Sequence, residues 1–148
     1  MKICRIFFLL LTTILLSTVS CQAASESIGI IKTVSGEVFL INTQMTLPAL
    51  ANMKIGQGDT IKTGKASSAG IIFEDDTVVS LGPNSEMAIA NFLFDPVDKK
   101  LSLITRLVKG TFCFVTGQIA KLAPKNVTFE TPEATLGVRG TKFLVKVD

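Results

Sequence analysis

The carboxylates of this chain are the first residues that could do chemistry, and they fall in segments where turns are expected. They are Asp59, Glu74, Asp75, Asp76 and Asp95. Glycoside hydrolysis would need two of them facing each other across a cleft. Calcium binding would need oxygen ligands spaced along one loop. Of these carboxylates, only Glu74, Asp75 and Asp76 are close enough in sequence to bind calcium together, and this is the alternative interpretation. Since aspartate and glutamate are common turn formers, we interpret all five as solvated turn residues.

Nucleophilic chemistry lacks its usual partner, because the chain contains no histidine. This excludes Ser–His and Cys–His pairs as well as zinc sites built on histidine. Cys113 is flanked by phenylalanines in "TFCFVT". Without a base to activate it, we expect a small buried apolar residue there, with a reactive thiol as the alternative. The sequence therefore predicts no enzyme, and it indicates no cofactor or metal ion.

The segment 131–145, "TPEATLGVRGTKFLV", contains an arginine between two glycines, a setting that could form a binding site for an anion. Arg139 stands between Gly137 and Gly140, and glycines permit backbone angles that other residues avoid. A guanidinium in such a turn can bind loop carbonyls or a carboxylate such as Asp59 or Glu133. This structural interpretation is the one we favour.

The functional alternative is that Arg139, together with Thr141 or Lys142, offers a fork of donors to an anionic ligand or a partner carboxylate. The two roles are compatible. Asp59 is a further candidate for binding or for shaping a turn, because it is the last residue of the predicted tight turn 56–59, which contains Gly56 and Gly58.

The elements that must position these residues are short strands separated by turn signals. The pattern predicts β-rich runs on both sides of Gly36, a hairpin around residues 74–76, a turn at 82–84 and a final strand in "TKFLVKVD". Residues 87–94 fit an extended strand with an irregularity near Asn91, with a helix as the alternative. About ten short strands predict an all-β fold, either a compact sandwich or a β-roll or solenoid-like stack. The echoes "SGEVFL" with "KGTFCF" fit stacked similar turns.

The first residues are typical of an export signal. Lys2 and Arg5 precede an apolar block over 6–16 and small residues up to Ala23, so we expect a signal peptide over 1–23 and one β domain over 24–148. "STVSC" also allows lipidation at Cys21, although Thr18 stands where leucine is usual. The apolar block is too short for a stable transmembrane helix. Without the leader, 13 basic residues face 12 acidic ones, which argues against a nucleic-acid partner.

Several segments together resemble the FecR domain family. They are "SGEVFL", the turn "GQGDTIKT", the pair of strands in "SSAGIIFEDDTVVSLGPNS" and the final "TPEATLGVRGTKFLV". The family usually has Asp-Gly where this chain has Asp75-Asp76. The resemblance implies an exported β domain outside the cytoplasmic membrane, and in some members the sensing half of an iron-uptake relay. Those members also carry an anti-sigma segment and a transmembrane helix, neither of which we find in this sequence.

We therefore expect an exported, non-enzymatic binding or scaffold domain of the bacterial periplasm or cell envelope. A protein partner is favoured over a small molecule. The alternative is a small-ligand or glycan-binding module, in which Arg139 and the loops near Asp59 line a shallow site. The absence of Trp and Tyr, which stack well on sugars, favours the protein partner.

Overall fold

The computed structural model describes residues 26–138 and 140–148, and it is an all-β fold, as the sequence predicts. The predicted signal peptide and Cys21 lie outside the described residues. Two short helical segments, α2 (Gln118–Leu122) and η2 (Pro124–Asn126), interrupt the strands. The strands are β1 (Ser27–Ser35), β2 (Val38–Ile41), β3 (Thr46–Pro48), β4 (Lys54–Gly56), β5 (Thr60–Thr63), β6 (Ser68–Phe73), β7 (Val78–Leu81), β8 (Glu86–Asp95), β9 (Lys100–Val115), β10 (Val127–Glu130), β11 (Thr135–Gly137) and β12 (Lys142–Val147).

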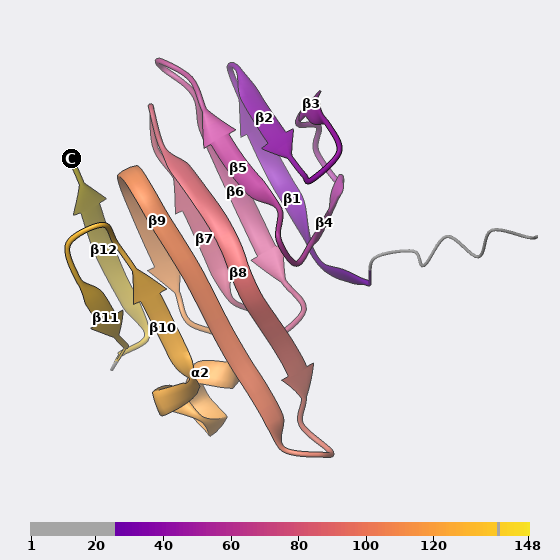
Figure 1. Ribbon diagram of the computed structural model, residues 1–148, viewed down its shortest axis with the longest axis vertical. Coiled ribbons are helices and arrows are strands. Elements are labelled where there is room, and N and C mark those ends of the chain that lie inside the picture. Colours follow the sequence, from indigo (N-terminus) through magenta and orange to yellow (C-terminus); the bar gives the residue numbers. More distant parts are fainter. Residues whose placement is uncertain (1–25, 139) are drawn as a thin grey trace, which may run out of the picture.

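The strands form one sheet that curls on itself into a half-barrel with two layers (Figure 1). Layer A has the order β4-β1-β6-β7-β9-β12, and layer B has the order β3-β2-β5-β8-β9-β10-β11. The long strand β9 belongs to both layers. Every pairing is antiparallel except that of β9 with β10. The sequence predicted either a sandwich or a β-roll, and the structure shows one curled sheet with two layers.

Four of the crossings between the two layers lie along one line, which we call the fold line. They are at Gly36 between β1 and β2, at 64–67 between β5 and β6, at 82–85 between β7 and β8, and at Gly110 inside β9. Gly36 and Gly110 have φ of 73° and 106°, which favour glycine. A β carbon at either position would also collide with a serine, Ser67 or Ser85. Glycine is therefore required twice for the same reason.

Equivalent hydrogen bonds fasten the two glycine crossings. The Glu37 amide donates to Ser67 Oγ at 2.9 Å, and the Thr111 amide donates to Ser85 Oγ at 3.1 Å. In return, the amides of Gly64 and Gly82 donate to the carbonyls of Glu37 and Thr111, both at 2.8 Å. The echo between "SGEVFL" and "KGTFCF" thus corresponds to a repeated structural unit.

The core lies between the layers. It consists of every second residue along the strands, because successive side chains of a strand point to opposite faces. Phe114 packs against Phe129 and Phe143, with ring centroids 4.2 and 5.1 Å away, and joins β9, β10 and β12. Cys113 is on the opposite side of β9 from Phe114 and is only half-buried, so its predicted place in the core is wrong. The strand alternation that buries both flanking phenylalanines turns the cysteine outward.

The segment 86–95 is extended, and its pairing with β9 shifts between Ile89 and Asn91, which confirms the predicted strand and its irregularity. The helix α2, in contrast, was not expected from the sequence. It lies at the end of the molecule away from the fold line (Figure 1) and inserts Ile119, which is fully buried. In the described part of the chain, no helix has the length and apolar character needed to cross a membrane.

Candidate functional site

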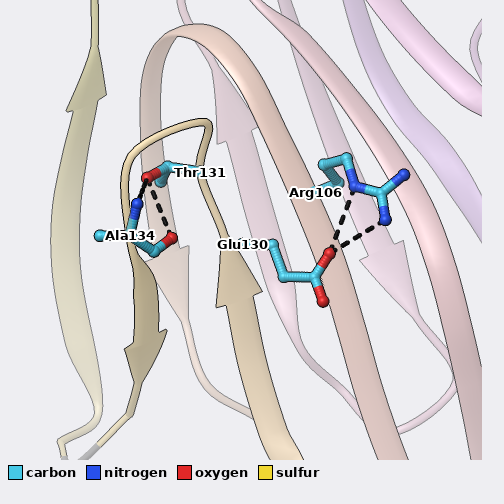
Figure 2. A network of polar contacts seen from close by, with 4 residues as sticks. All are labelled: Arg106, Glu130, Thr131 and Ala134. Atoms are coloured by element: carbon cyan, nitrogen blue, oxygen red, sulfur yellow. Dashed lines mark hydrogen bonds and ion pairs between the residues drawn. The ribbon is translucent and has the colours of Figure 1, made fainter.

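The segment 131–145 begins with a tight turn between β10 and β11 (Figure 2). The Thr131 hydroxyl accepts from the Ala134 amide at 3.0 Å, and the Thr131 amide donates to the Ala134 carbonyl at 2.8 Å. Just before the turn, Glu130 accepts two hydrogen bonds from the Arg106 guanidinium, at 3.1 and 3.2 Å, across the parallel pair β9–β10. Thr131 and its neighbours therefore shape the turn.

The second half of the segment is fastened to the end of β9. The Thr116 hydroxyl donates to the Gly140 carbonyl at 2.9 Å, and its amide donates to the Thr141 carbonyl at 2.9 Å. Gly140 has a φ of 150°, as its prediction as a turn glycine requires. Lys142 follows as an exposed residue at the start of β12. Arg139 lies outside the described residues, so both of its predicted roles stay predictions.

Gly137 is not a turn glycine, contrary to the sequence-based prediction. It is the last residue of β11, opposite Thr128 of β10, and it is not among the described residues with positive φ. A β carbon there would meet no described atom within 4 Å. Nothing in the described structure therefore requires glycine at this position.

Asp59 acts as a turn residue. Its carboxylate accepts from the Gly56 amide at 2.8 Å, and Gly58 between them has a φ of 88°. Gly56 ends β4, so the predicted glycine turn is confirmed. Asp59 precedes β5, whereas Thr141 and Lys142 adjoin β12, and β8 and β9 separate those strands in the sheet order. The fold therefore does not bring Asp59 to the predicted fork of Thr141 and Lys142.

Asp75 is the residue whose role the sequence failed to indicate. Its side chain is fully buried, so its interpretation as a solvated turn former is wrong. One carboxylate oxygen accepts from the Thr77 amide at 3.1 Å, and the other accepts from the Thr77 hydroxyl at 2.8 Å and from the Ile119 amide at 3.2 Å. The Asp75 carbonyl accepts from the Gln118 amide at 2.6 Å. This aspartate therefore fixes α2 to the β6–β7 turn.

The neighbouring Asp76 is exposed, and it adopts a φ of 65°. Its carboxylate accepts from the Gln118 side-chain amide at 2.8 Å. The two aspartates thus hold the same helix from inside and from outside. Among the residues that the structure describes, no three acidic or cysteine side chains form a group suited to a metal ion.

The outer faces of the two layers carry different alignments of side chains across their strands. Layer B carries cross-strand ion pairs, Lys62 with Glu86 at 3.7 Å and Arg106 with Glu130 at 3.1 Å. Layer A carries a row of aligned apolar residues, which we call the apolar stripe. Its members, in register across β1, β6, β7 and β9, are Ile30, Ile72, Val78 and Val115.

A lysine continues the apolar stripe at each end. Lys54 of β4 is opposite Ile30, and Lys142 of β12 is opposite Val115. The stripe residues are half-buried, except Val115, which is 40% exposed. Lys142, a predicted binding residue, therefore borders the apolar stripe. In the sequence, these residues alternate with the buried residues of their strands, which predicts that they point outward. That they line up with one another follows only from the strand register.

These features define an all-β domain whose buried polar side chains hold turns in place and whose outer face in layer A carries the apolar stripe. The FecR protein family matches residues 59–148, so the chain belongs to this family, as its resemblance indicated. The matched part includes the crossing at 82–85, Asp75 and the whole segment 131–145. Comparison with curated proteins and with solved structures found no match.

Proposed function

We propose that this chain is an exported, non-enzymatic domain of the bacterial cell envelope that binds a protein partner through the outer face of layer A. Membership of the FecR family supports a place in iron-uptake signalling. The signal-like residues 1–23 support export to the periplasm, either free or anchored through a lipid at Cys21.

The apolar stripe is the observation that carries this proposal. Side chains buried between the layers need no partner, but the stripe leaves aligned apolar groups on an outer surface. Covering such groups is favourable by about 25 cal/mol for each Å² of apolar surface removed from water. Because Lys54 and Lys142 flank the stripe, the complementary partner has an apolar patch bordered by acidic groups.

Site-specific photo-crosslinking in the envelope tests this surface. A crosslinker at Ser80, exposed on β7, should form adducts with a protein, whereas one at the exposed Ala90 on layer B should not. Ile72→Asp should abolish the Ser80 adducts because it places a charge in the stripe. The matched control is Ile104→Asp, which changes a half-buried isoleucine on the outer face of layer B. Equal adducts from both faces, or Ser80 adducts that survive Ile72→Asp, would refute the proposed surface.

Glycan or small-ligand binding is the second candidate, because a groove of about 670 Å³ lies beside β4. Asn42, Gln57 and Asp59 line it, but each uses a side-chain oxygen within the fold, for the amides of Gln44, Phe92 and Gly56 respectively. Fewer oxygens are therefore left to bind a sugar. Crosslinks that capture only polysaccharide would favour this candidate over the protein partner.

A further inference from the structure

The strand β12 has a neighbour on one side only. It pairs with β9 from Lys142 opposite Val115 to Val147 opposite Gly110, and no other described strand pairs with it. In Figure 1, β12 and β11 form the side of the molecule opposite β3 and β4. An edge of this kind presents unpaired amides and carbonyls that can accept a further strand.

The two faces of β12 differ. Phe143, Val145 and Val147 point inward, are half-buried and pack against the core. Lys142, Leu144 and Lys146 point outward, and Leu144 is 70% exposed. Lysines on an edge strand discourage indiscriminate pairing, so a suitable partner strand must bring negative charge to matching positions.

We propose that β12 pairs antiparallel with β12 of a second copy of this chain, about a twofold axis at Val145. In this register Lys142 of each copy is opposite Asp148 of the other, which creates an ion pair at each end. On the inner face, Phe143 is opposite Val147 and Val145 is opposite itself, so apolar side chains meet apolar side chains. On the outer face, Leu144 is opposite the aliphatic stem of Lys146.

Among the registers that pair most of β12 with its copy, the charges of β12 select this one. Centring the pair on Leu144 would place Lys142 opposite Lys146 twice, and centring it on Lys146 would place that lysine opposite itself. Like charges directly opposite each other destabilise a strand pair, whereas opposite charges stabilise it. A shift by one residue would set the inner face of one copy against the outer face of the other.

The surroundings of β12 also favour a neighbour. The Asp148 side chain is 91% exposed, and its one ion pair within the described residues is the exposed pair with Lys146, at 3.1 Å. In the presence of the second copy, this carboxylate can reorient toward Lys142 of that copy. Beside it, a cavity of about 300 Å³ separates β12 from the β10–β11 turn, with Leu136, Val145 and Val147 in its wall. A second strand along β12 would cover the open side of this apolar seam.

Sedimentation equilibrium of the full chain and its charge variants tests the proposal. The unchanged protein should be a dimer at micromolar concentration. Lys142→Asp should raise the dimer dissociation constant at least roughly tenfold, because two attractions become two repulsions. Adding Asp148→Lys to that variant should restore dimerisation, since the charges are then exchanged. Circular dichroism should show that each variant is folded.

Two controls separate this interface from other effects. Lys65→Asp makes the same charge change on an exposed crossing loop and should leave the dimer intact. Ile72→Asp, which tests the apolar stripe, should leave it intact as well, so loss of partner binding and loss of the dimer are distinguishable. A monomeric unchanged protein, a dimer unaffected by Lys142→Asp, or a double variant that stays monomeric would each overturn the proposal.

Discussion

The two adjacent aspartates of the β6–β7 turn show how strongly position decides the role of a residue. Asp75 is fully buried and accepts hydrogen bonds from Thr77 and Ile119, whereas Asp76 is exposed. A buried carboxylate is tolerated only when donors surround it, and here two backbone amides and a hydroxyl do so. The Asp75 carboxylate is thus a structural acceptor for α2.

Paired substitutions measure this difference. Asp75→Asn should lower the free energy of unfolding by about 1–3 kcal/mol, because an amide NH₂ would face amide donors in a buried site. Asp76→Asn should change it by less than about 0.5 kcal/mol, since asparagine tolerates the same positive φ at an exposed position. Urea unfolding of both variants makes the comparison. Equal losses would show that Asp75 does not hold α2 as its contacts indicate.

The sequence predicted residue roles where the cause is local. The turn at Gly58 and Asp59 follows from glycine's freedom and from a short side chain that can reach a nearby amide. The burial of Asp75 depends on α2, whose Ile119 lies 44 residues further along the chain, and turn preference favours the exposed role for both aspartates. One feature of the sequence does indicate that Asp75 is buried. Phe73, Asp75 and Thr77 occupy every second position, and they continue the alternation of buried residues from β6 into β7.

At the scale of elements, α2 was missed because five residues are too short for helical periodicity to be read. Its position is set instead by Gly117, which precedes it and packs against the backbone of Asp75 and Thr77. The Gly117 amide also donates to the Thr77 hydroxyl at 3.0 Å. The strands and hairpins were predictable, because alternation and turn residues are properties of neighbouring positions.

Substituting Gly117, which precedes α2, and Gly137, which ends β11, tests which of these two positions is tightly packed. Gly117→Ala should lower the free energy of unfolding by about 2 kcal/mol or more, because the added carbon would collide with backbone atoms of the β6–β7 turn. Gly137→Ala should leave it unchanged or raise it by up to about 1 kcal/mol, because the unfolded chain loses freedom and no described atom is near. Thermal unfolding compares them. A large loss for Gly137→Ala would restore its predicted role as a turn glycine.

At the scale of the whole molecule, the sequence predicted the class of fold but not how its layers are joined. The echo of "SGEVFL" in "KGTFCF" was visible, yet only the register shows that both glycines lie on the same fold line. The four crossings on this line stack as the strands do, and one of them divides the long strand β9 between the two layers. The pairings of β12 in layer A and of β10 in layer B therefore both depend on β9.

Gly110 is the residue at which a substitution should affect both layers, because it bends β9, the strand that both layers share. Gly110→Ala should lower the free energy of unfolding by about 3 kcal/mol or more, from backbone strain at a φ of 106° and from collision with Ser85. Because β9 pairs with β12 in layer A and with β10 in layer B, both layers should lose stability together. Amide hydrogen exchange read in β10 and β12 should therefore accelerate by the same factor in this variant. Faster exchange in one of these strands alone would show that the layers unfold independently, and that the bend at Gly110 does not couple them.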